Sequence, residues 1–157
     1  MVSLPKLAGA ESRPLAGLQR SAAWDRLWRR SPSEDRFAKG AVEARIRGVF
    51  HLDATDPLPL VHDNTLRDYH AHLARCLSFP FRASHCEEAE PLVLDSSVLV
   101  TGLCDPVRTP PDSVTGVLCE VVFRNTARLP LALLKVDPRN PNRQMIDDYW
   151  YWFWNCR

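Results

Sequence analysis

The sequence lacks the motifs that mark most enzymes. It contains only six glycines in 157 residues, and no glycine-rich phosphate loop, G-x-S-x-G turn or H-E-x-x-H helix motif occurs in it. A nucleophile, base or phosphate site of the familiar kinds is therefore missing. We expect a protein without catalytic activity.

Long apolar runs and paired cysteines are missing too. No stretch approaches the roughly 20 consecutive apolar residues of a membrane-spanning helix, and the first residues lack the apolar segment of a secretory signal. The five cysteines are an odd number and form no C-x-x-C pair, which argues against a closed disulfide framework and a zinc ribbon. We expect reduced thiols in a cytoplasmic protein that does not contact a membrane.

Charge of one sign is also scarce, because the formal net charge is only +1. Residues 1–62 carry an excess of basic side chains, and residues 63–157 are mildly acidic. The basic cluster comprises Arg26, Arg29, Arg30 and Arg36. A charged cluster of this kind is usually a solvated face, so nucleic-acid binding is not expected.

The chain is expected to divide near residue 62. Asp56-Pro57-Leu58-Pro59 cannot lie inside a helix, because proline lacks an N–H and restricts the residue before it. We expect a folded domain over residues 63–157 and a basic, partly disordered or helical extension over residues 1–62. Two helical patterns occur in the extension, over residues 21–30 with Trp24, Leu27 and Trp28, and over residues 33–49 with Phe37, Ala41, Ala44 and Ile46.

The domain opens with a predicted helix from Asp63 to about Leu77. Asp63, Asn64 and Thr65 offer side-chain oxygens that can cap its first turn. Apolar residues recur at helical spacing and are expected to face the core: Leu66, Tyr69, Leu73 and Leu77.

The apolar period then changes from 3.6 to 2, which indicates strands. The predicted strands cover residues 79–83, 98–103, 116–123 and 128–134, with a turn at residues 124–127. In the third of these, Val117, Cys119, Val121 and Phe123 share one face. Short strands joined by tight turns predict a small antiparallel sheet of four or five strands, or an SH3-like barrel.

The chain closes with an aromatic segment that is too apolar to be a solvated tail. Asn140-Pro141 is typical of a helix start, and three tryptophans follow the carboxylates of Asp147 and Asp148. A helix is favoured, although Trp150, Trp152 and Trp154 also alternate as they would in a strand. The segment is expected to dock on the body of an α+β fold.

Two motifs give the chain a family resemblance. The first runs from Leu73 to Phe81 and is followed by Arg82-Ala83 and by Glu87-Glu88. The second is the aromatic run from Ile146 to Trp154. With these motifs, residues 66–157 resemble the small calcium-binding proteins typified by the cyanobacterial CcbP-type proteins. The resemblance implies an α+β domain that binds Ca²⁺ through surface carboxylates, without catalysis.

Calcium takes six to eight oxygen ligands, and the sequence has no EF-hand loop to supply them. One candidate ligand set is the acidic cluster of Glu87, Glu88, Glu90 and Asp95. A second set is Asp105, Glu120, Asp147 and Asp148. The alternative interpretation is a solvated acidic loop for the first set, and helix-dipole pairing of the two final aspartates for the second.

Two other functions fit parts of the sequence. His72 and Cys76 are four residues apart on the predicted helix and could share a zinc ion, with His62 or His85-Cys86 completing the site and His70 nearby. A protein partner could instead contact the tryptophan-rich segment or the Trp24/Trp28 helix. The second hypothesis makes the domain an interaction module that has lost its metal site.

Overall fold

The computed structural model describes the backbone of residues 35–89 and 92–157, and the side chains of residues 39–85 and 96–157. Three helices and a five-stranded sheet make up this part of the chain. In chain order they are α2 (Asp35–Val49), α3 (Asp63–Cys76), β1 (Phe81–Ala89), β2 (Leu92–Leu103), β3 (Leu118–Val122), β4 (Thr126–Pro130), the 3-10 turn η1 (Leu131–Leu133), β5 (Leu134–Lys135) and α4 (Arg143–Asn155).

The sheet is antiparallel and open, with the strand order β4-β3-β2-β1-β5. This confirms the predicted α+β class and the predicted antiparallel sheet. The alternative of an SH3-like barrel is wrong, because β4 and β5 lie at opposite edges and do not pair. Strand β5 spans two residues and pairs only with β1, so it cannot close the sheet.

Helix α3 has the predicted position, although its cap lies one residue earlier. The His62 ring accepts a hydrogen bond from the Thr65 N–H, and Thr65 Oγ1 accepts one from the His62 N–H at 3.0 Å. This reciprocal pair satisfies donors that the first turn leaves free. The predicted core residues of this segment are confirmed as buried, namely Leu66, Tyr69, Leu73 and Leu77.

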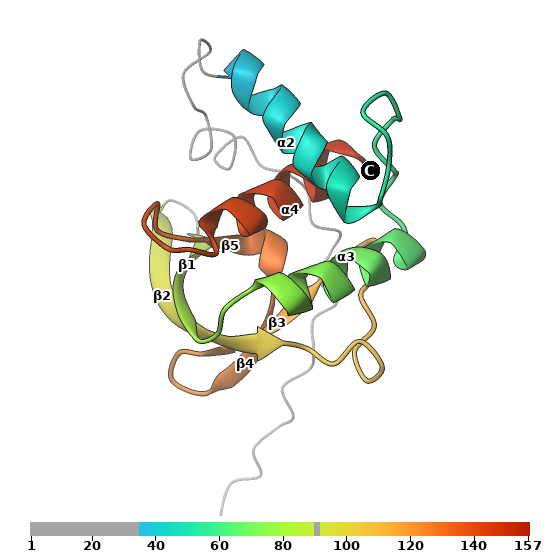
Figure 1. Ribbon diagram of the computed structural model, residues 1–157. Coiled ribbons are helices and arrows are strands. Elements are labelled where there is room, and N and C mark those ends of the chain that lie inside the picture. Colours follow the sequence, from blue (N-terminus) through green and yellow to red (C-terminus); the bar gives the residue numbers. More distant parts are fainter. Residues whose placement is uncertain (1–34, 90–91) are drawn as a thin grey trace, which may run out of the picture.

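Helix α4 fills the core with the aromatic segment, as predicted. Tyr149, Trp152 and Phe153 are fully buried, and the Trp152 ring stacks on Tyr69 with a centroid distance of 4.8 Å. The helix begins at Arg143, two residues after Pro141. Its burial on several sides matches a helix that lies between other elements, and Figure 1 shows α4 between α2 and the sheet.

Helix α2 also contributes to this core. Ile46 is fully buried, and Val42 and Val49 pack against the core from the same side of the helix. The expected apolar side through Ala41 and Ala44 is wrong, because both residues are exposed. Val42, Ile46 and Val49, at positions i, i+4 and i+7, form the core-facing side of the helix instead. The predicted boundary between an extension over residues 1–62 and a domain over residues 63–157 stays a prediction.

All four predicted strands differ from the observed ones in at least one boundary. Strand β1 begins at Phe81 and, with β2, continues to the ends of a long hairpin at Ala89 and Leu92. The expected strand over residues 128–134 is divided, because η1 follows Pro130 and buries Leu131. Phe123 lies beyond β3 and is 57% exposed. The residues expected on the same face are buried, namely Val117, Cys119 and Val121.

The remaining expectations concern the first part of the chain and membranes. The predicted helix over residues 21–30, with Trp24 and Trp28, lies outside the described residues. Of the helices in the described part of the chain, none combines the length and the apolar character that crossing a bilayer requires.

Candidate functional site

The second predicted ligand set is centred on α4, where both aspartates are already engaged by arginines. The Asp148 carboxylate is buried and accepts two hydrogen bonds from the Arg45 guanidinium, at 2.7 and 2.8 Å. Asp147 accepts a hydrogen bond of 2.6 Å from Arg143 Nε, one helical turn earlier. Charge-assisted bonds of this kind compete with a cation for the same oxygens.

The other two members of this set lie apart from α4. Glu120 is exposed on β3, opposite Arg128 of β4. Asp105 follows β2 and accepts a hydrogen bond from the Val107 N–H at 2.9 Å. The four carboxylates are not gathered. Within residues 39–85 and 96–157, no three His, Cys, Asp or Glu side chains form a group that could hold a metal ion.

The first predicted set lies at the end of the β1–β2 hairpin. Glu87 is opposite Leu94 in the ladder, Glu88 is opposite Val93, and Asp95 is opposite Cys86. Asp95 and Glu88 are thus diagonal neighbours in register. Glu90 lies outside the described residues. The hairpin therefore brings the backbone of Glu88 on β1 close to that of Asp95 on β2. Which residues bind a metal stays a prediction.

Among the described side chains, the histidines and the cysteine of the zinc hypothesis do not gather into one group of three ligands. His70 is buried, and its Nε2 lies 2.9 Å from the Cys104 carbonyl oxygen. His62 caps α3. His72 and Cys76 remain close, with Nδ1 and Sγ 4.0 Å apart. The described residues therefore offer this pair without a third nitrogen, thiol or carboxylate ligand.

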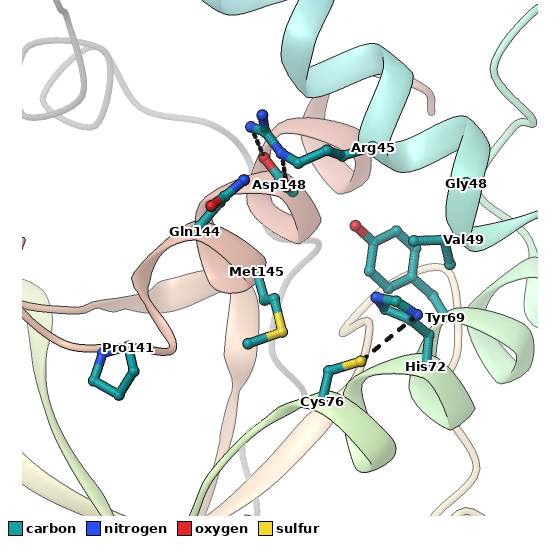
Figure 2. Close-up of a pocket in the computed structure, with 10 residues that line it drawn as sticks. All are labelled: Arg45, Gly48, Val49, Tyr69, His72, Cys76, Pro141, Gln144, Met145 and Asp148. Atoms are coloured by element: carbon teal, nitrogen blue, oxygen red, sulfur yellow. Dashed lines mark hydrogen bonds and ion pairs between the residues drawn. The ribbon is translucent and has the colours of Figure 1, made fainter. Parts of the chain in front are cut away.

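His72 and Cys76 line a groove of about 510 Å³ between the three helices. Helix α2 contributes one side, α3 the second, and α4 with its preceding turn the third, as Figure 2 shows. The lining residues are Arg45, Gly48, Val49, Tyr69, His72, Cys76, Pro141, Gln144, Met145 and Asp148. Most of the lining is apolar, and the Arg45–Asp148 pair forms its charged end.

Burial shifts the pKa values of titratable side chains that line the groove. It raises the pKa of Tyr69 well above its usual value, and the nearby Asp148 carboxylate adds to this effect. Burial also lowers the pKa of His72, and the Arg75 cation acts in the same direction. The Arg45 pKa is raised, chiefly by its hydrogen bonds to Asp148. At neutral pH the Tyr69 phenol and the His72 imidazole are therefore uncharged, and Arg45 and Asp148 form an ion pair.

Sequence reasoning missed this groove, although part of its signal was visible. His72 and Cys76 were recognised by their i, i+4 spacing. Gln144, Met145 and Asp148 have a comparable spacing on α4, which places them on one side of that helix. Arg45 gave no such signal, because its partner Asp148 is 103 residues away in the chain.

The tryptophan-rich segment offers little surface to a partner. Trp152 is fully buried and Trp150 is 9% exposed, whereas Trp154 is half-buried. The buried Trp152 Nε1 donates a hydrogen bond to the Pro59 carbonyl oxygen at 2.8 Å. These residues hold the connector before α3 against α4, which is a structural role.

No protein-family model and no curated protein sequence matches this chain. Among solved structures, its fold is similar to the crystal structure of Anabaena CcbP, with a TM-score of 0.52, 20% sequence identity, and coverage of 71% of this chain and 88% of that one. It is equally similar to a structure described as a calcium binding protein in the calcium-binding form, with a TM-score of 0.52, 15% identity, and coverage of 79% and 94%. The resemblance to the CcbP-type small calcium-binding proteins is thus confirmed at the level of the fold.

Proposed function

We propose that the protein binds Ca²⁺ without catalysing a reaction, through the carboxylates of Glu87, Glu88, Glu90 and Asp95. The observation that supports this proposal most is the fold likeness, since one of the similar structures is described as a calcium-binding form. Calcium accepts carboxylate, carbonyl and water oxygens in flexible geometry. The β1–β2 hairpin carries three of these carboxylate residues close to its end, at Glu87, Glu88 and Asp95.

The carboxylate set in the hairpin is better suited to binding calcium than the set centred on α4, for a further physical reason. In the α4 set, Asp148 is bonded to Arg45 and Asp147 to Arg143, so calcium would have to break two charge-assisted interactions. The register of the hairpin makes Glu88 and Asp95 diagonal neighbours on adjacent strands, and two like charges at such positions favour a bound cation. Selective calcium binding would therefore stabilise the β1–β2 hairpin.

Titration calorimetry of the full chain with Ca²⁺ tests this proposal, with Mg²⁺ as the competing ion. We expect saturable binding that is selective for Ca²⁺ and is weakened in the double variant Glu87→Gln/Glu88→Gln. The matched control is Asp105→Asn/Glu120→Gln, which removes the same number of charges from exposed positions outside the hairpin. The control is expected to bind calcium as the parent does.

Two outcomes would overturn the proposal in different ways. Equal weakening in both double variants would mean that the ion responds to overall charge and not to the hairpin. No binding at millimolar Ca²⁺, with both proteins folded by circular dichroism, would reject calcium binding. The interaction-module hypothesis would then take its place.

A cytoplasmic location belongs to the same proposal. Among the described side chains, Cys76, Cys104, Cys119 and Cys156 are free thiols. Free thiols are typical of reducing compartments. Mass measurement of the protein alkylated in denaturant directly after cell lysis is expected to show these four thiols modified, because denaturation exposes the buried Cys104 and Cys119.

A further inference from the structure

His72 and Cys76 form a pair of soft ligands that the calcium proposal does not use. They lie one turn apart on α3, with Nδ1 of His72 4.0 Å from Sγ of Cys76. The His72 ring packs edge-on against Tyr69, at a centroid distance of 6.0 Å and an interplanar angle of 87°. Because Tyr69 is fixed in the core, it limits the rotation of the imidazole beside the thiol.

The spacing of the two atoms fits an ion with few ligands. Metal–sulfur and metal–nitrogen bonds of about 2.3 and about 2.0 Å meet at about 135° when their outer atoms are 4.0 Å apart. A tetrahedral ion with the same bond lengths needs a separation of about 3.5 Å. The observed separation therefore favours a linear or trigonal ion over a tetrahedral one.

A third soft atom lines the same groove from the opposite helix. Met145 of α4 borders the groove together with His72 and Cys76, and Figure 2 shows its side chain directed into the groove. Calcium takes oxygen ligands, whereas thiolate and thioether sulfurs are soft donors of the kind that bind Cu(I). The carboxylate of Asp148, which also lines the groove, is already held by Arg45 through two hydrogen bonds.

We propose that the groove between α2, α3 and α4 binds a soft monovalent ion, Cu(I), through Cys76 Sγ, His72 Nδ1 and Met145 Sδ. Binding displaces the proton of the Cys76 thiol to solvent, because the thiolate is the form that ligates a metal. No electron is transferred, since the copper enters and stays as Cu(I). The proposal is independent of the calcium site, which lies at the β1–β2 hairpin.

Anaerobic titration of the full chain with Cu(I), against a chromophoric Cu(I) chelator of known affinity, tests this site. We expect one equivalent bound by the parent protein. Cys76→Ser and His72→Asn are each expected to weaken binding by about ten-fold or more, since loss of a group that merely orients a ligand already costs about that much. Met145→Leu keeps the apolar volume and is expected to weaken binding by a smaller factor.

The control is Cys156→Ser, which removes a half-buried thiol at the far end of α4 and is expected to bind one equivalent as the parent does. The site is overturned if the parent binds no Cu(I), or if Cys76→Ser binds as tightly as Cys156→Ser. Unchanged affinity in Met145→Leu would reject the three-ligand site. Zn²⁺ binding that displaces Cu(I) would reject the choice of ion.

Folding is checked independently of metal. Each variant is compared with the parent by circular dichroism and by its thermal midpoint in the absence of copper, so that a loss of affinity can be separated from a loss of structure. Calcium titration of Cys76→Ser is expected to match the parent. A simultaneous loss of both metals would indicate unfolding and would reject the assignment of Cys76 as a ligand.

Discussion

The Arg45 guanidinium of α2 holds the buried Asp148 carboxylate of α4 through two parallel hydrogen bonds of 2.7 and 2.8 Å. The Asp148 side chain is 8% exposed, whereas that of Arg45 is 39% exposed. A bidentate pair of this kind fixes orientation as well as distance. It therefore sets how α2 lies on α4 and closes the charged end of the groove.

Arg45→Ala should destabilise the protein by leaving the Asp148 carboxylate buried without its partner. Breaking a fully buried pair costs about 3–5 kcal/mol. Because Arg45 is partly exposed, water can replace some of its interaction, and we expect a loss of about 2 kcal/mol in the free energy of unfolding. Urea denaturation at neutral pH measures this difference.

The matched control for that variant is Lys39→Ala, which removes an exposed cation 3.9 Å from Glu43 on the same helix. It should cost less than about 0.5 kcal/mol. The double variant Arg45→Met/Asp148→Leu should be more stable than Arg45→Ala, since neither charge is left buried. A stability of Arg45→Ala equal to that of Lys39→Ala would contradict the importance of the pair.

Gly116→Ala should be strongly unfavourable. Gly116 has a φ of +70°, and a Cβ there would clash with the Tyr149 hydroxyl and lie 2.8 Å from the Phe153 ring. The Tyr149 hydroxyl also accepts a hydrogen bond from the Val117 N–H at 2.8 Å, so it cannot move away without leaving that buried donor unpaired. We expect a loss of about 2–3 kcal/mol in unfolding free energy, from the positive φ and the lost hydrogen bond together.

Gly40→Ala is the opposite case and serves as the comparison. Gly40 lies in α2, is exposed, and an added Cβ would meet nothing within 4 Å. Alanine should stabilise the helix by about 0.5–1 kcal/mol. Thermal unfolding of both variants should therefore shift the midpoint in opposite directions, and a downward shift for Gly40→Ala would be inconsistent with the described helix.

Asn142→Ala should release the segment that leads into β1. The Asn142 side chain is 1% exposed, accepts a hydrogen bond from the Ser78 N–H at 2.9 Å and donates one to the Ser78 carbonyl at 2.7 Å. Losing both bonds should cost about 2 kcal/mol. Asn142→Asp should cost more, because a carboxylate cannot donate to the carbonyl and would be buried beside it.

Asn155→Ala provides the control for a lost asparagine. Its side chain donates to the Tyr151 carbonyl within the same helix and is exposed, so its removal should change the unfolding free energy by less than about 0.5 kcal/mol. Chemical denaturation of the three variants should give the order Asn155→Ala, Asn142→Ala, Asn142→Asp from most to least stable. Any other order would refute the bridging role of Asn142.

The local pattern predicted the elements whose burial follows a simple period. The spacing of Leu66, Tyr69 and Leu73 located α3 and its core face, and all three residues are buried. The tryptophan-rich run was correctly predicted to pack on the fold. Its start was placed too early because Asn140-Pro141 looks like a helix cap, whereas Asn142 turns its side chain to Ser78 and the helix begins at Arg143.

The parts that sequence could not predict depend on contacts between distant residues. Whether the sheet closes into a barrel depends on the partner of β5, and β5 pairs with β1 instead of β4. The hairpin extends through Glu87 and Glu88 because β1 pairs with β2 along the whole length of β1, although acidic residues do not favour strands locally. The groove and the Arg45–Asp148 pair likewise need three helices to be placed together.

Burial of Cys119 should make the protein less stable at alkaline pH. Burial, with a contribution from Cys104, raises the pKa of the Cys119 thiol from 9.0 to about 12, and its Sγ donates to the Leu129 carbonyl at 3.2 Å. Between these two values the unfolded chain loses this proton while the folded protein keeps it. The folded state then binds more protons, so stability falls as pH rises from about 9 to about 12.

Urea denaturation at several pH values, under reducing conditions, should reveal this fall. Each pH unit should remove up to about 1.4 kcal/mol for one such thiol. Cys119→Ala should show a shallower fall between pH 9 and 10, before Tyr151 contributes, because the pKa of Tyr151 rises from 10.0 to about 12. At pH 7 the thiol is protonated in both the folded and the unfolded chain, so any difference there measures the lost packing and the lost hydrogen bond to Leu129. An identical pH dependence for the parent and Cys119→Ala would show that this thiol does not couple folding to pH.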